Sequence, residues 1–256
     1  MIYRYFIKIS FDGTAYNGWQ VQKNSSQTVQ QKINDGLSQL LNEKIEVHGC
    51  CRTDAGVHAK ELFAHFDSFK SNLHKDSTVD WIYRFNKMVP VDISIDKIYS
   101  AKNNANARFD ATSRTYQYLI HQRRNPFLLN KSWYYYSDLD LGLMNKATAV
   151  LKKHKDFSAF SKMNTQAKTN ICRIDSAKWT KNKAGDLVFT ISADRFLRSM
   201  IRMIVGTMVQ LGKHKMSLYD FEEIINQKDC RNASPLAPAC GLYLLKVKYP
   251  QKIFLK

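Results

Sequence analysis

The segment of this chain best suited to chemistry is Cys51-Arg52-Thr53-Asp54-Ala55-Gly56-Val57-His58-Ala59. It follows a predicted strand, and its small residues allow a substrate to approach the backbone around Asp54 closely. The Asp54 carboxylate is therefore a candidate for chemistry on a bound substrate. The alternative is a turn aspartate that accepts hydrogen bonds from its own backbone. His58 is of a type that often acts as a general base, but we expect it to support the loop.

A second candidate is the arginine-rich run from residue 195 to residue 206. Its pattern predicts a helix over residues 195–211, on which Arg195, Arg198 and Arg202 share one face. The other faces are almost wholly apolar, which indicates a buried helix, and a buried charge is costly without an anionic partner. We therefore expect Arg202 to form a buried ion pair, whereas a solvated basic stripe remains the alternative for Arg195 and Arg198.

A third candidate is Arg114-Thr115-Tyr116-Gln117-Tyr118. The alternation of a strand places Tyr116 and Tyr118 on the same face. Aromatic side chains beside arginines commonly stack on unpaired bases, so this pattern fits RNA binding. A pair of tyrosines packed in a core fits the same residues equally well.

The overall charge favours a polyanionic partner. Lys and Arg total 39 against 22 Asp and Glu, which gives a net charge of +17. Such a surplus attracts nucleic acid in a salt-dependent way, although a lysine-rich proteome would also produce it. The most apolar stretch, residues 200–209, is too short to span a bilayer. We therefore expect no membrane segment. The five cysteines lack metal-site spacing and the acidic residues do not cluster, so we expect no metal site. The odd number of cysteines does not fit a disulfide framework, so we expect a reducing cytoplasm.

The alternation of element types predicts an α+β fold with mainly antiparallel sheets. We expect two ferredoxin-like halves, residues 1–104 with Asp54 and residues 105–256 with Tyr116 and the arginine helix, although no sequence repeat links them. The predicted helices span residues 28–41, 80–88, 141–154, 195–211 and 218–226. The predicted strands span residues 2–10, 44–50, 62–67, 93–100, 115–121, 132–136, 174–180, 187–192 and 241–249.

Taken together, these segments closely resemble the TruA family of tRNA pseudouridine synthases, over roughly residues 2–250. The residues at 52–59 are similar to the catalytic-aspartate motif of that family, which is highly specific. The other matching segments, in the family's order, are Phe11-Asp12-Gly13-Thr14-Ala15-Tyr16-Asn17-Gly18-Trp19-Gln20, Ala107-Arg108-Phe109 with Arg114-Thr115-Tyr116, the run from Phe196 to Gly212, and Ala237-Pro238-Ala239-Cys240-Gly241-Leu242-Tyr243-Leu244.

The resemblance implies a set of catalytic residues. Asp54 would be the catalytic carboxylate, and Arg202 would form an ion pair with it. Tyr116 would stack on the target uracil. Because it is the only phenol among these residues, our own hypothesis is that it also takes the proton from C5. The resemblance further implies that no cofactor is needed.

The resemblance also implies substrate-binding residues. Leu242 would pack against the base, Arg52 would hold the flipped nucleotide or the displaced strand, and Arg195 and Arg198 would add positive charge. The chain departs from the family pattern at Cys51, where glycine is usual, at Met203, where asparagine is common, and at Arg198. These departures concern substrate preference more than the reaction.

The implied activity is conversion of uridine to pseudouridine at positions 38, 39 and 40 of the tRNA anticodon stem-loop. The implied protein is a homodimer whose halves meet around a central basic cleft that takes the tRNA. Two alternatives remain open from the residues: a pseudouridine synthase for another RNA site, and a non-catalytic RNA-binding protein.

Overall fold

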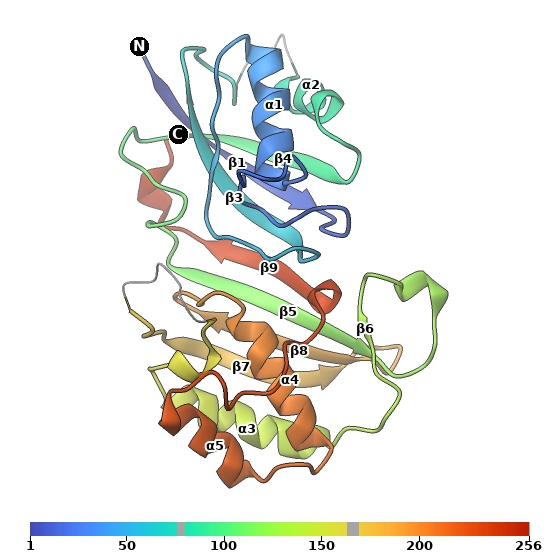
Figure 1. The fold of residues 1–256 in the computed structure, drawn as a ribbon. Coiled ribbons are helices and arrows are strands. Elements are labelled where there is room, and N and C mark those ends of the chain that lie inside the picture. Colours follow the sequence, from blue (N-terminus) through green and yellow to red (C-terminus); the bar gives the residue numbers. More distant parts are fainter. Residues whose placement is uncertain (76–79, 163–168, 256) are drawn as a thin grey trace. The chain divides into compact units, whose positions relative to one another are not determined.

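The computed structural model describes residues 1–75, 80–162 and 169–255. It has a mixed α and β fold in which most strand pairs are antiparallel, as predicted. The chain forms two compact units, residues 1–112 together with 244–256, and residues 113–243 (Figure 1). In the described part of the chain, none of the helices is long and apolar enough to cross a membrane.

The first unit is built on an antiparallel sheet with β1 in its centre. The helices α1 and α2 lie together on one face of this sheet (Figure 1). Bulky side chains of β1 and β3 are buried and form much of the core of this unit. The elements are β1 (Tyr3–Phe11), α1 (Val29–Leu41), β2 (His48–Gly49), β3 (His58–Ser68), α2 (Trp81–Met88) and β4 (Ile93–Ala101).

Both helices of the first unit begin where the sequence predicts. Thr28 caps α1 by accepting a hydrogen bond from the backbone of Gln31, and Asp80 caps α2 by accepting one from the backbone of Tyr83. Such caps satisfy backbone donors that have no partner within the helix. A short polar side chain immediately before the apolar run thus marks the start of each of these helices.

The strand predicted at residues 44–50 is reduced to two residues, His48–Gly49. The backbone before it bonds to side chains of α1 instead of a neighbouring strand. The amide of Ile45 donates to Ser38 Oγ at 2.9 Å, and that of Val47 donates to Asn34 Oδ1 at 2.8 Å. Because these side chains satisfy the backbone, this segment needs no strand partner.

The second unit is built on an antiparallel sheet of three strands, with β8 between β5 and β7. The strands predicted at residues 174–180 and 187–192 pair as a hairpin, and Gly185 in its turn has a left-handed φ of 87°. The strand β6 adds in parallel to β5. The elements are β5 (Ser113–His121), η1 (Pro126–Leu128), β6 (Trp133–Tyr134), α3 (Leu141–Lys153), η2 (Ser158–Phe160), β7 (Ile174–Lys181), β8 (Leu187–Ala193), α4 (Met200–Gly212), α5 (Leu218–Gln227) and η3 (Ala239–Gly241).

The helix predicted to begin at Arg195 begins at Met200. Ser199 has a left-handed φ of 62°, which interrupts the helical backbone. Before it, Asp194 Oδ1 accepts a hydrogen bond from the backbone of Arg195 at 2.7 Å and so favours a non-helical turn. The expectation that Arg195, Arg198 and Arg202 share one helix face is therefore wrong. The expectation of a buried helix is confirmed, because almost every residue of α4 is buried.

The compact units differ from the predicted halves at two places. Residues 105–112 belong to the first unit, where the amide of Ala107 donates to His65 Nδ1 at 3.1 Å and its carbonyl accepts from Tyr249 Oη at 2.6 Å. The C-terminal residues 244–256 also belong to this unit, so the boundary falls within β9 (Leu242–Lys248). The η4 turn (Gln251–Ile253) follows β9. Division into two ferredoxin-like halves stays a prediction.

Candidate active-site loop and its supports

The loop that carries Asp54 joins β2 to β3 in the first unit. It is closed by a turn in which the amide of Val57 donates to the carbonyl of Asp54 at 3.2 Å. Gly56 has a φ of 76°, a conformation that glycine adopts without steric cost. Asp54 is partly exposed and its neighbour Thr53 is buried. The loop thus presents one carboxylate to the surface of the unit from a backbone of fixed shape.

The first matching segment, residues 11–20, packs directly on this loop. The amide of Trp19 donates to the carbonyl of Thr53 at 3.2 Å, and the amide of Gly56 donates to the carbonyl of Tyr16 at 3.3 Å. A Cβ added to Gly18, which has a φ of 90°, would lie 2.5 Å from the Thr53 carbonyl oxygen. Two motifs about forty residues apart therefore form one structure, and the glycine is required by their close approach.

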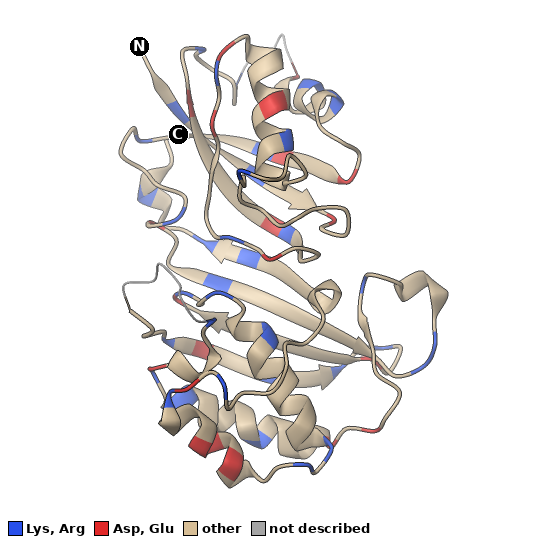
Figure 2. Ribbon diagram, in the orientation of Figure 1, with Lys and Arg blue, Asp and Glu red and all other residues tan. Residues whose placement is uncertain are grey.

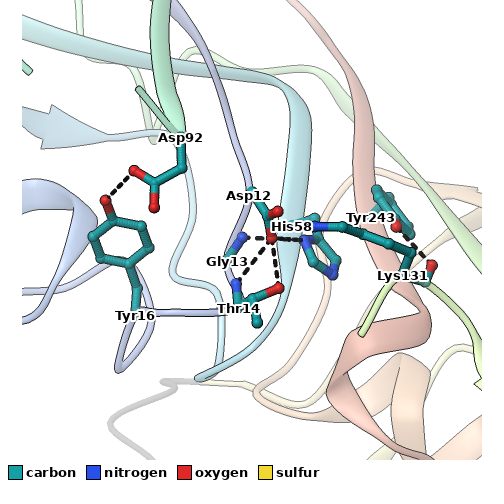
Figure 3. Close-up of polar contacts among 8 residues, drawn as sticks. All are labelled: Asp12, Gly13, Thr14, Tyr16, His58, Asp92, Lys131 and Tyr243. Carbon is teal, nitrogen blue, oxygen red and sulfur yellow. Dashed lines mark hydrogen bonds and ion pairs between the residues drawn. The ribbon is translucent and has the colours of Figure 1, made fainter. Parts of the chain in front are cut away.

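A polar network fastens the start of β3 to the end of β1 (Figure 3). The buried His58 places its Nδ1 atom 3.1 Å from the amide of Gly13 and 3.0 Å from Asp12 Oδ1. The same Asp12 oxygen accepts hydrogen bonds from the amide and hydroxyl of Thr14 at 3.1 and 2.6 Å. His58 therefore has the supporting position expected from the sequence.

A second polar contact holds the N-terminal segment from its other side (Figure 3). The Tyr16 hydroxyl donates to Asp92 Oδ1 at 2.5 Å. Burial, and then the hydrogen bond with Asp92, raise the pKa of this phenol, so the hydroxyl remains a donor at neutral pH. Sequence reasoning missed the roles of Tyr16, Asp12 and Asp92, because their partners are distant in the chain. The only sequence signal for Asp12 and Tyr16 was their place in the first matching segment, and Asp92 had no such signal.

In the second unit, Tyr116 lies on β5 and is 6% exposed. Its ring meets that of Phe196 edge-on, with 5.3 Å between the centroids. Tyr118, two residues along the strand, donates its hydroxyl to the carbonyl of Pro238 at 2.7 Å, and burial raises its pKa. Tyr118 is therefore a core residue, which is the alternative that the sequence left open for this pair.

Arg202 is the one arginine of its run that lies in α4. Its Nε atom donates to the carbonyl of Ala237 at 2.7 Å, and the amide of Ala237 donates back to the Arg202 carbonyl at 3.1 Å. A Cβ on Gly206 would lie 2.2 Å from the carbonyl oxygen of Pro235, so this segment rests directly on the helix. The last two matching segments of the chain are thereby joined.

The remaining candidates divide between the two units. Arg52 is exposed beside Asp54 in the first unit. In the second unit, Leu242 is 6% exposed, Arg195 is partly exposed and Arg198 is exposed. Each unit thus holds part of the candidate set on its own framework. Within the described part of the chain, no three His, Cys, Asp or Glu residues are grouped as metal ligands would be.

Comparison with known proteins gives a consistent result. Residues 153–250 match a family model described as tRNA pseudouridine synthase. The chain is 44% identical to tRNA pseudouridine synthase A of Bacteroides thetaiotaomicron, covering 98% of this chain and 92% of that protein. It is 44% identical to the protein of the same name from Bacteroides fragilis, covering 99% of each chain. The protein of that name from Salmonella arizonae is 35% identical over 98% of this chain and 92% of its own.

Proposed function

The chain belongs to the tRNA pseudouridine synthase A family, and we propose that it converts uridine to pseudouridine at positions 38, 39 and 40 of the tRNA anticodon stem-loop. Family membership makes it an isomerase that acts on uridine in tRNA. The observation that carries the proposal is the 44% sequence identity with such a relative over 99% of the chain. The matched part includes the Asp54 loop, which backbone hydrogen bonds support.

We propose that Asp54 is the catalytic carboxylate. The reaction breaks the C1′–N1 bond of uridine, turns the uracil and rejoins it to C1′ through C5. Glycosidases that use water need a second carboxyl group to activate water or protonate the leaving oxygen. Here the base stays bound and returns, so one carboxylate suffices. It either bonds to the substrate or stabilises positive charge on the sugar, and no cofactor takes part.

Arg202 is proposed to form an ion pair with Asp54 in the active enzyme. A nearby guanidinium favours the ionised form of a carboxylate, and its planar shape fixes the carboxylate's orientation better than an ammonium group would. The support is the 2.7 Å hydrogen bond from Arg202 Nε to the carbonyl of Ala237, which fixes the plane of the guanidinium within its own unit.

Tyr116 and Leu242 are proposed to hold the uracil after it leaves the helix. Flipping a base costs a few kcal/mol, and stacking on an aromatic ring returns about 1–3 kcal/mol. Phe196 meets the ring of Tyr116 edge-on and would restrict its rotation. We also propose that Tyr116, as its phenolate, takes the C5 proton once the base is reattached while N1 gains a proton in exchange, because it is the one tyrosine among the proposed site residues.

Arg52 is proposed to hold the flipped nucleotide or the displaced strand, and Arg195 and Arg198 are proposed to add positive charge for binding the RNA. Arg52 and Arg198 are exposed, as a phosphate contact requires, and the net charge of +17 would draw RNA to the protein. We propose that the working enzyme is a cytoplasmic homodimer with the tRNA in a basic cleft, as the family resemblance implies.

The test is to incubate the purified protein, without added metal or cofactor, with unmodified tRNA that carries uridine at positions 38, 39 and 40. Pseudouridine is mapped by carbodiimide labelling and primer extension, with Asp54→Asn as the control. We expect primer stops at those positions that disappear with the variant. Stops at another position would overturn the substrate site, and tight binding without stops would turn the interpretation toward a non-catalytic RNA-binding protein.

A further inference from the structure

Three cations lie over two aromatic rings on the outer surface of α2 in the first unit. The Nζ atom of Lys70 and the guanidinium carbon of Arg84 lie 5.8 and 5.7 Å from the centroid of the Trp81 ring. The Nζ atom of Lys87 lies 5.4 Å from the centroid of the Tyr83 ring, which is 60% exposed. We call these five residues the α2 cationic surface. Lys and Arg positions on α2 are blue in Figure 2.

The positive charges of this surface are not neutralised within the described part of the chain. No acidic side chain there is within ion-pair distance of Lys70, Arg84 or Lys87. Two acidic residues of the described chain lie next to this surface in sequence or contact, and both bond to the backbone: Glu43 accepts from the amide of Phe69 at 3.0 Å, and Asp80 accepts from the amide of Tyr83 at 2.9 Å. Cations that converge on one indole repel each other, and a shared anion would relieve that repulsion.

The aromatic rings give these cations a fixed position. A cation–π contact at an exposed site holds a long, flexible side chain over the ring face. Lys70 is also anchored through its backbone, because its carbonyl accepts a hydrogen bond from Tyr5 Oη at 2.8 Å. The three cationic groups are therefore partly ordered before any ligand binds, which lowers the entropy cost of binding.

We propose that the α2 cationic surface binds phosphates of the substrate tRNA outside the catalytic residues. The inference rests on the proposed function for the identity of the RNA. It adds a contact that none of the candidate residues of the site supplies. Because phosphate contacts carry no sequence information, this surface would contribute affinity and orientation rather than choice of uridine.

An acidic protein is the competing partner, and the observations favour RNA. The whole chain is strongly basic and belongs to a family named for tRNA modification. Two cations over the Trp81 ring, and a third over the exposed Tyr83 ring on the same helix, match the combination of positive charge and aromatic rings that binds RNA backbones. The competing partner becomes an outcome of the test.

The experiment compares the wild-type protein with a triple variant, Lys70→Gln, Arg84→Gln and Lys87→Gln. These substitutions remove three charges from exposed positions and keep residues that favour helices. The matched control is Lys178→Gln, Lys181→Gln and Lys183→Gln, which removes three exposed charges from the β7–β8 hairpin of the second unit. Thermal melts first establish that both variants are folded.

The main measurement is the affinity for full-length unmodified tRNA between 50 and 200 mM salt. Each lost phosphate contact lowers the logarithmic salt slope by about 0.9, so losing three lowers it by about 2.7. The wild-type protein would then lose about 40-fold more affinity over this range than the triple variant. We expect the hairpin variant to keep the wild-type slope. At saturating tRNA, we expect the triple variant to keep its kcat while its KM rises.

A crosslinking experiment tests contact between the α2 cationic surface and tRNA without removing any charge. Benzoylphenylalanine replaces Tyr83, or replaces Tyr219 of the second unit as a comparison, since both positions are well exposed. We expect irradiation to crosslink tRNA at position 83 and not at 219. If the triple variant kept the wild-type salt slope of tRNA affinity and position 83 gave no crosslink, this inference would be overturned. An acidic protein would then be the favoured partner of the surface. Failure of the wild-type protein to bind tRNA would instead overturn the proposed function.

Discussion

Gly18→Ala is expected to damage the Asp54 loop through a backbone collision. The added Cβ would lie 2.5 Å from the carbonyl oxygen of Thr53 and 3.2 Å from the carbonyl carbon of Asp54. Gly18 also has a φ of 90°, which L-residues rarely adopt. That conformation costs about 1–2 kcal/mol and overpacking adds about 1–3 kcal/mol, so we expect a loss of about 2–5 kcal/mol of unfolding free energy.

Gly185→Ala is the matched control for this prediction. Gly185 has a nearly identical φ of 87°, but no atom lies within 4 Å of the position where its Cβ would be. It should therefore lose only the conformational part, about 1–2 kcal/mol. The difference between the two variants isolates the collision with the loop.

The assays are urea unfolding and single-turnover formation of pseudouridine. A shift of the Asp54 carboxylate by about 1 Å can lower the rate about 100-fold, and we expect such a loss for Gly18→Ala only. If Gly18→Ala were as stable and as active as Gly185→Ala, the conclusion that this glycine is needed to pack the N-terminal segment on the loop would be refuted.

Three further predictions concern individual side chains. Tyr116→Phe should lower kcat by a factor of about 10²–10⁴ without weakening tRNA binding; normal turnover would leave Tyr116 with stacking alone. Arg202→Lys keeps the charge but loses the planar fork, so turnover should fall while the tRNA Kd, measured by filter binding, changes little; unchanged turnover would argue against the ion pair with Asp54. Burial lowers the pKa of His65 to about 4, below its unfolded value of about 6.5. The unfolded state then binds more protons between these values, so urea unfolding should show about 1–3 kcal/mol of stability lost as pH falls from 6.5 to 4. His65→Asn, which keeps an acceptor for the Ala107 amide, should show a flatter profile; an equal slope in both proteins would exclude His65 as the source.

The sequence predicted elements well where the signal was local. Thr28 and Asp80 mark helix starts through their own side chains, and the turn at Gly185 marks a hairpin through its own backbone. It failed where a side-chain hydrogen bond or a single backbone conformation, neither of which hydrophobic periodicity reveals, decided the local structure. Residues 44–47 look like a strand but bond to side chains of α1, and the apolar run after Arg195 looks helical until Ser199 takes a left-handed conformation.

In the candidate site, too, only the local part could be predicted from the sequence. Asp54 was identified from a contiguous motif, and the resemblance supplied partners elsewhere in the chain. The supports of its loop could not be predicted, because Gly13, Tyr16 and Gly18 act through contacts with residues about 35 or more positions away. Periodicity and turn rules describe neighbours in the chain, whereas these contacts arise only when the sheet of the first unit has formed.

The central claim, that Asp54 alone supplies the catalytic carboxylate, is tested most directly by following the C5 hydrogen. The protein is mixed in excess with tRNA that carries tritium at C5 of its uridines, and tritium released to water is counted, because C5 must lose its hydrogen when it joins C1′. We expect Asp54→Asn to bind the tRNA with affinity close to wild type and to release no tritium above background, while the wild-type protein releases the tritium of the modified uridines. Release by Asp54→Asn at a rate close to wild type would contradict the account.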